Sequence, residues 1–167
     1  MAQVLTLPAF AQAQAPTPAQ AASPAPAAET DTDAPKWRLL VSPYAFHWRP
    51  SAEHQRVWAV GVERQASDAS VVGASYFSNS FGQDSAYVYY GQRYQGLFGR
   101  PQLYAQWSVG MLYGYKGAYE DKVPLNNNGF SPGALLTGGW QFTREHSLAF
   151  HLLGDAGVMF EWAYRFK

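Results

Sequence analysis

Residues 103–115 read LYAQWSVGMLYGY, and their pattern indicates the fold class of the protein. Apolar side chains alternate with small or polar ones along it, which is the period of a β-strand and not of a helix. Trp107, Val109 and Met111 fall on one face, and Gln106 and Ser108 fall on the other. A tilted strand needs about 9–11 residues to cross a bilayer. The stretch therefore predicts a membrane-crossing strand whose apolar face meets lipid.

The end of the chain repeats the pattern, with Phe160, Trp162, Tyr164 and Phe166 on one face. In water, a row of exposed aromatic side chains would favour aggregation, whereas in lipid it forms an outer surface and interface girdle. A soluble lipocalin-like barrel or a β-sandwich would alternate too, but with its apolar face inward. The opposite faces here are rich in Gly, Ser and Gln, which favours a membrane barrel.

Six further segments alternate in the same way, and turn-forming residues separate them. An even number of antiparallel strands can close into a barrel without an unpaired edge, as hydrocarbon requires. We therefore predict an all-β fold, an eight-stranded antiparallel transmembrane β-barrel. The expected strands lie near residues 37–48, 56–64, 70–79, 85–94, 103–116, 131–142, 147–154 and 157–166.

Composition narrows the classes of function. The chain has 167 residues, 12 Lys+Arg against 12 Asp+Glu, and no Cys. A neutral balance argues against nucleic acid as a partner, and the lack of Cys excludes disulfides and thiolate chemistry. No run of about 18 apolar residues exists, which excludes a membrane-spanning helix. Neither a metal-ligand spacing nor a phosphate-binding glycine loop is present, so we expect no metal and no cofactor.

The composition changes near residue 36. Residues 1–35 hold twelve Ala and six Pro but no Gly. Residues 1–15 end in small-x-small patterns and are interpreted as the remnant of a secretory signal peptide that lacks its charged start. Residues 16–35 are interpreted as a disordered Ala/Pro-rich linker, and residues 36–167 as the barrel. We expect the protein to be exported through the periplasm and to lie in the outer membrane of a Gram-negative cell.

Several blocks over residues 40–167 resemble the PagP-type lipid A palmitoyltransferases. The first predicted strand carries Pro43 and ends in Phe46-His47, where the family has its essential His. Arg56-Val57-Trp58-Ala59-Val60-Gly61 resembles the entry to the second strand, and Phe77-Ser78-Asn79-Ser80-Phe81 resembles the family's Phe-x-Asp-Ser-Trp. Gly91 follows Ser80 at the family's spacing, and Val158–Trp162 resembles the start of the last strand. The order and spacing of these blocks carry the resemblance.

The resemblance implies an outer-membrane acyltransferase. Such an enzyme moves a palmitoyl-type chain from a phospholipid donor to lipid A, at a site that faces the cell exterior and without a cofactor. An apolar slot in the barrel measures the acyl chain. The expected partners are phospholipid, lipid A and the membrane, not nucleic acid, and the expected state is a monomer.

Carried onto this chain, the catalytic residues fall on His47, Ser80 and Asn79. Asn79 stands where the family has Asp, and an amide cannot stabilise an imidazolium as a carboxylate does. Asp84, five residues after Asn79, could supply the missing carboxylate. Gly91 is the expected floor of the slot. Arg56 and Trp58 are expected to bind substrate.

The residues themselves leave alternatives open. His47 also suits a position at the level of the lipid headgroups, and a Ser near a turn is usually structural. His54 and His146 fall in predicted turns and are interpreted as solvated, whereas His151 faces the lumen. Arg49, Arg56 and Arg93 suit either phosphate contacts or ordinary snorkelling to headgroups.

Two other functions compete with acyl transfer. A lipid A deacylase would use His-x-Ser-Asn on one strand, but Tyr76 stands in place of that His. A catalytically impaired barrel with a lipid-binding or structural role would explain Asn79, because fold and function are separable.

Overall fold

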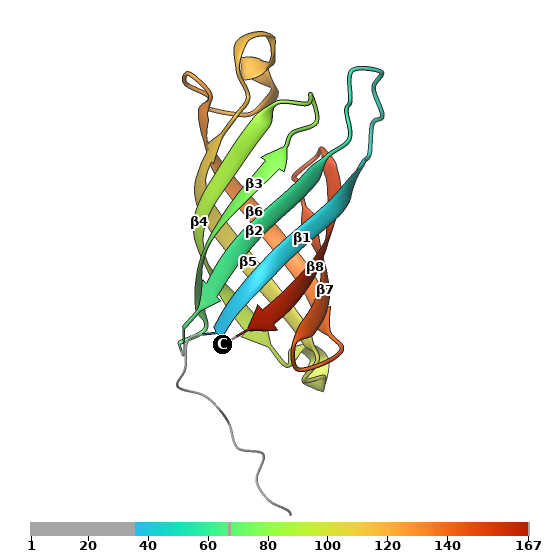
Figure 1. The fold of residues 1–167 in the computed structure, drawn as a ribbon, viewed down its shortest axis with the longest axis vertical. Helices are drawn as coiled ribbons and strands as arrows, with labels where there is room; N and C mark the ends of the chain where they lie inside the picture. The colour runs from blue at the N-terminus through green and yellow to red at the C-terminus, as the bar shows by residue number, and fades with distance from the viewer. Residues whose placement is uncertain (1–35, 67, 167) are drawn as a thin grey trace, which may run out of the picture. The chain divides into compact units, whose positions relative to one another are not determined.

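The computed structural model describes residues 36–66 and 68–166, and eight antiparallel strands form one closed barrel in chain order (Figure 1). The strands are β1 (Lys36–His47), β2 (Trp58–Gln65), β3 (Ser70–Ser78), β4 (Asp84–Gln95), β5 (Leu103–Tyr113), β6 (Phe130–Gln141), β7 (His146–Leu152) and β8 (Gly157–Phe166). The predicted eight-stranded antiparallel β-barrel is confirmed, with strand ends that differ by a few residues. The interpreted signal peptide, the linker, Ser67 and Lys167 lie outside the described residues.

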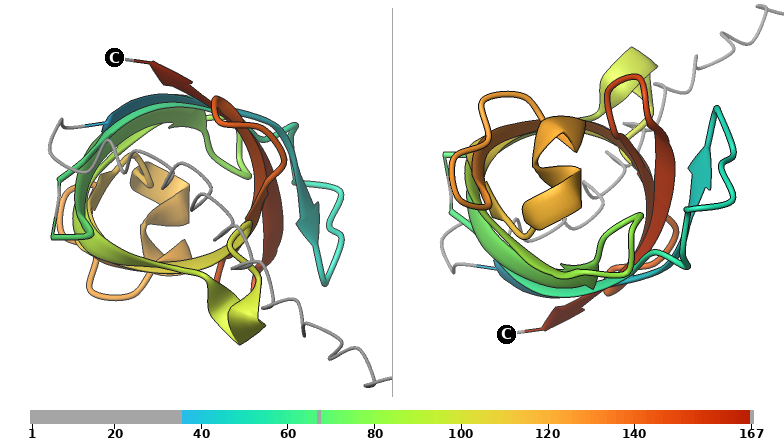
Figure 2. Two further views of the ribbon diagram at one scale, coloured as in Figure 1. Left: turned by 90° about the horizontal axis from the view of Figure 1, so that it is seen from below. Right: turned by 90° about the horizontal axis from the view of Figure 1, so that it is seen from above.

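The barrel has two distinct ends. β1 begins and β8 ends at one of them, which we call the terminal end (Figure 1). We call the other the site end, and its connecting segments are residues 48–57, 79–83, 114–129 and 153–156. The short 3-10 helix η2 (Gly117–Lys122) lies across the ring of strands at the site end (Figure 2). A second, η1 (Leu97–Gly99), lies in a turn at the terminal end. Among the described residues, no helix has the length and apolar character to cross a membrane.

Side chains alternate across the wall as the sequence predicts. On β5, Gln106 and Ser108 are buried inside the barrel, whereas Val109 and Met111 are exposed outside. Apolar side chains thus cover the outer wall, the reverse of a soluble barrel.

Inward-facing glycines make room for tyrosine rings. A Cβ atom added at Gly73 would overlap the ring of Tyr89, and one added at Gly139 would overlap the ring of Tyr104. Both tyrosines are buried. The glycines of the inner faces therefore let aromatic rings lie flat against the wall inside a narrow barrel.

The strand ladder is incomplete in two places near the site end. Pairing of β1 with β2 ends at Ser42 and Ala59, and pairing of β6 with β7 reaches only from Gln141 to Leu136. Each unpaired stretch contains a proline, which has no N–H to donate. Pro43 lies at the register shift where β1 bulges against β8, a tolerated place for proline in a sheet. Near the site end, the wall thus has one opening between β1 and β2 and another between β6 and β7.

Candidate functional site

His47 and Ser80 meet at the site end. His47 is the last residue of β1, and Ser80 follows the end of β3. The two strands run in the same direction with β2 between them, so both residues reach the same rim. The Nε2 atom of His47 lies 2.7 Å from the Oγ atom of Ser80, and both residues are half-buried. This distance allows a proton to pass from the hydroxyl to the imidazole.

Asn79 lies beside this pair but its side chain holds the loop. Its Oδ1 atom accepts the backbone N–H groups of Phe81 and Gln83, at 2.9 and 3.0 Å. Asn79 is 1% exposed, so these bonds satisfy a buried amide. The described contacts include no bond between Asn79 and His47. Asn79 therefore fixes the turn that presents Ser80.

Asp84 does not supply a carboxylate to His47. It is the first residue of β4, and its Oδ1 atom accepts the hydroxyl of Tyr76 at 2.7 Å on the exposed side of the wall. The alternative that Asp84 replaces the missing acid therefore finds no support in its contacts.

Aromatic rings pack beside His47 and Ser80. One of them, His54, lies in surroundings that differ from those the sequence predicted. The interpretation of His54 as a solvated turn residue is wrong, because its ring packs on that of His47 with a centroid distance of 4.3 Å. Phe81 contacts His54 edge to face and stacks on Tyr119 at 4.2 Å. These contacts connect segments that are distant in the chain, so no local pattern reveals them.

Tyr115 is a further residue that the sequence reasoning missed. Burial raises the pKa of its phenol, and a hydrogen bond with Ser80 acts in the opposite direction. Tyr115 falls within the predicted strand 103–116, but β5 ends at Tyr113, so Tyr115 lies in the following site-end segment. Its hydroxyl therefore lies beside Ser80.

Arg56 and Trp58 line a cavity of about 570 Å³ at the opening between β1 and β2, together with Pro43, Gln55, Ser78 and Gly82. The N–H of Gln55 donates to the carbonyl oxygen of Ser80 at 2.8 Å, so the cavity adjoins the loop that carries Ser80. The cavity combines a guanidinium with an aromatic wall. Such a lining suits the phosphate and the upper acyl chain of a lipid.

Gly91 faces the lumen and pairs with Ser108 of β5. A Cβ atom added there would overlap the carbonyl oxygen of Trp107 and lie 3.0 Å from the Cα atom of Ser108. A larger residue would push against the backbone of β5 before it filled a slot. Gly91 therefore serves the close approach of two strands, whatever its position relative to an acyl chain.

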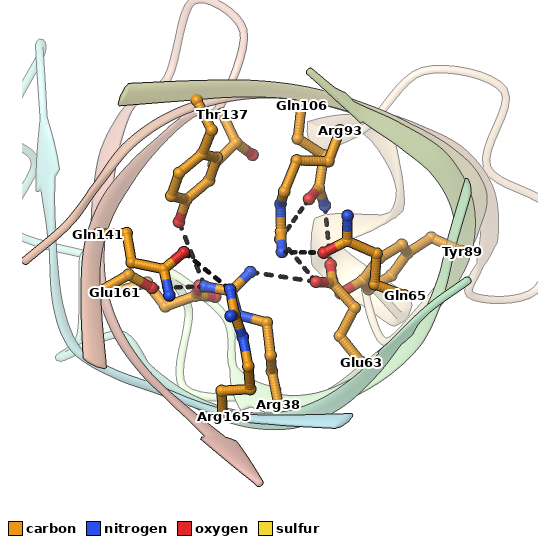
Figure 3. A network of polar contacts seen from close by, with 12 residues as sticks. Arg38, Glu63, Gln65, Tyr89, Arg93, Gln106, Thr137, Gln141, Glu161 and Arg165 are labelled. Atoms are coloured by element: carbon orange, nitrogen blue, oxygen red, sulfur yellow. Dashed lines mark hydrogen bonds and ion pairs between the residues drawn. The ribbon is translucent and has the colours of Figure 1, made fainter. Parts of the chain in front are cut away.

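An ion network fills the lumen toward the terminal end (Figure 3). Glu63 bonds to Arg38 at 3.1 Å and to Arg93 at 2.6 Å, and all three residues are at most 3% exposed. Gln106 and Tyr89 donate to the second oxygen of Glu63. Both interpretations of Arg93, contact with lipid phosphates and snorkelling to headgroups, are wrong, because the alternation of β4 points its side chain inward. Buried charges survive here because each finds a partner.

Thr137, His151 and Glu161 form a second polar cluster inside the barrel. The Oγ1 atom of Thr137 lies 2.8 Å from Nδ1 of His151, whose Nε2 atom lies 3.0 Å from Glu161. The prediction that His151 faces the lumen is confirmed. The order hydroxyl, imidazole, carboxylate resembles a nucleophilic triad, but all three residues are less than 9% exposed. The three side chains are therefore enclosed in the lumen.

His146 lies on the outer wall and is not a solvated turn residue. It begins β7, and its ring stacks on Trp162 at 5.4 Å. Such an aromatic group at the terminal end fits an interface girdle.

The described residues contain no group of three or more His, Cys, Asp or Glu side chains that could hold a metal ion. Neither the protein-family models nor the curated protein sequences gave a match to this chain.

Proposed function

We propose that this protein is an outer-membrane acyltransferase that moves an acyl chain from a phospholipid to lipid A, with His47 and Ser80 as its catalytic residues. One observation carries the proposal. The imidazole and the hydroxyl lie 2.7 Å apart although 33 positions separate them in the chain. They meet at a half-exposed rim, where a lipid ester can approach them.

The chemistry needs only these two groups and the lipids. Ser80 Oγ attacks the carbonyl carbon of the donor ester, and its proton passes to His47 Nε2. The glycerol oxygen leaves with that proton as the alcohol of a lysophospholipid. The acceptor hydroxyl then attacks the acyl-serine, gives its proton to His47, and Ser80 recovers a proton as the new ester departs.

The outer surface supports a location in the membrane. Large apolar side chains on every strand are exposed, among them Val88 at 61% and Leu136 at 60%. Exposure of this kind over a whole wall is unfavourable in water and ordinary in lipid.

The openings in the wall support lateral entry of lipid chains. The cavity with Arg56 and Trp58 lies at the opening between β1 and β2. Arg56 is suited to a phosphate at the headgroup level while the acyl chain passes toward the lumen. Leu40, Ala45 and Ala59 face the lumen between this rim and the ion network, and the polar cluster of Thr137, His151 and Glu161 lies in the same section. This section is the candidate slot, and the ion network is its floor.

The test is expression with a proper export signal in a Gram-negative host that lacks its own lipid A palmitoyltransferase. Mass spectra of the host's lipid A are recorded, with Ser80→Ala and His47→Asn as controls. An added acyl mass that disappears in both controls supports acyl transfer and identifies the donor chain. A lost acyl mass indicates a deacylase. An unchanged spectrum from a folded outer-membrane protein overturns the proposal and favours a lipid-binding barrel.

A further inference from the structure

Among the described residues, the His47 ring packs against one other ring, that of His54. The two planes are inclined by 36° with centroids 4.3 Å apart. His54 belongs to the segment 48–57, whose Gln55 donates a hydrogen bond to the Ser80 carbonyl oxygen. The ring contact therefore joins two segments that are already held together at Ser80.

His54 contacts a second ring as well. Phe81 meets it edge to face at 5.8 Å, and Phe81 stacks on Tyr119 with an angle of 13°. We call His47, His54, Phe81 and Tyr119 the ring stack. The ring stack connects the end of β1 with three of the site-end segments, so rotation of the His47 ring would disturb all of them.

His54 contributes through its ring faces and not through its nitrogens. Its Nδ1 atom is buried and has no hydrogen-bond partner among the described residues. This nitrogen therefore makes no contact that would hold His47 or Ser80. The titratable groups around it are His47 on one face and, beyond Phe81, Tyr115, Tyr119 and Lys122.

A base that receives a proton from a hydroxyl must keep its nitrogen aimed at that hydroxyl. A carboxylate on the far nitrogen usually holds the imidazole. In the described part of the chain, no carboxylate bonds to His47, and the amide of Asn79 is committed to its own loop. Besides the bond to Ser80, the described contacts of the His47 ring are those with the ring stack.

We propose that His54 is a positioning residue that holds the His47 imidazole toward Ser80 by ring stacking, in place of a carboxylate. The effect of His54 on catalysis rests on the proposed acyl transfer, whereas its ring contact with His47 does not. It implies that an aromatic ring is required at position 54 and that a titrating group is not.

Two variants separate these requirements. His54→Phe keeps a ring without a titratable group, and His54→Leu keeps an apolar side chain without a ring. We expect His54→Phe to keep kcat within about threefold, and His54→Leu to lower kcat by about 10- to 100-fold with little change in KM, as part of what a positioned base supplies. If His54→Leu matches His54→Phe, the ring is not needed and the proposal is overturned. If His54→Phe loses as much as His54→Leu, a nitrogen of His54 acts and the proposal is also overturned.

A second readout does not depend on activity. Nitrogen resonances of His47 in the full-length protein in micelles, assigned with His47→Asn, report whether its Nε2 atom remains hydrogen-bonded to Ser80. We expect the wild type and His54→Phe to keep this bond and His54→Leu to lose it. A bond kept in all three proteins overturns the proposal. If the wild type transfers no acyl chain, the proposed function fails, and the resonances alone decide the role of His54.

Discussion

The Nε2 atom of His47 lies 2.7 Å from the Oγ atom of Ser80, and Oγ1 of Thr137 lies at nearly the same distance, 2.8 Å, from Nδ1 of His151. The two hydroxyl–imidazole pairs differ in access. The first is half-buried at the rim, whereas the second is enclosed in the lumen and bonded to Glu161. Geometry alone would favour the second pair because it has a carboxylate. Access favours the first, because the proposed lipid substrate would approach the barrel at the rim.

This contrast gives the first prediction. Ser80→Ala and His47→Asn should each lower acyl transfer by at least about 100-fold, because nucleophile and base act as a unit. Thr137→Val should retain activity within about threefold. The measurement is transfer of a radiolabelled acyl chain from phospholipid to lipid A in mixed micelles.

The folded state of each variant is checked by its heat-modifiable mobility on gels. Transfer that persists in Ser80→Ala and disappears in a folded Thr137→Val would move the site into the lumen.

The second prediction concerns Asn79. Asn79→Ala removes the acceptor of two backbone N–H groups in a buried loop, which costs about 1–3 kcal/mol when such groups remain unsatisfied. We expect activity to fall by about tenfold or more because Ser80 loses its fixed place. Thermal unfolding and acyl transfer are measured on the same preparation.

Asn79→Asp is the matched variant. An acid at this position would raise activity if it acted on His47 electrostatically. The loop geometry indicates a change of less than about threefold, because a carboxylate oxygen accepts the same N–H groups and no bond to His47 is altered. A rise of about 100-fold would show that charge at this position limits the native protein.

The sequence was sufficient to predict the fold and to place His47 and Ser80 at the same rim of the barrel. Period-2 alternation and turn residues are local signals, so all eight strands could be located. His47 and Ser80 could be placed at one rim because alternate strands of an antiparallel barrel run the same way. Their contact distance could not be predicted, because it depends on how the two strand ends converge.

The rest of the site depends on contacts between distant segments. The sequence predicts a solvated His54 because no residue near it in the chain indicates that Phe81 contacts its ring. The pairing of Arg38 with Glu63 requires the register of β1 on β2, which alternation alone does not specify. Asn79 carried a usable signal, since an Asn before a Gly-containing turn often accepts backbone N–H groups, and Gly82 has a φ of 75°.

The third prediction concerns the ion network. Glu63→Ala leaves Arg38 and Arg93 buried without their shared carboxylate, and removal of one partner from a buried ion pair typically costs about 3–5 kcal/mol. We expect a marked loss of stability in urea unfolding from lipid vesicles. Glu145→Ala, at an exposed turn of the terminal end, is the control and should change stability by less than about 0.5 kcal/mol. Equal stability of the two variants would mean that the network is not a structural floor.

The fourth prediction tests the slot without disturbing the strand pairing at Gly91. Ala59 is buried on the lumen face of β2, and its neighbour Val60 is exposed on the outer face. Ala59→Leu places a larger side chain in the proposed slot between the rim and the ion network, so we expect the longest acyl chains to be excluded. We expect the preference between chains that differ by one methylene to shift about tenfold toward the shorter chain. Val60→Leu adds its methylene toward lipid and should leave the preference unchanged. The transferred chains are identified by mass spectrometry of lipid A, and an unaltered chain preference in an active Ala59→Leu protein would place the acyl chain outside this part of the lumen.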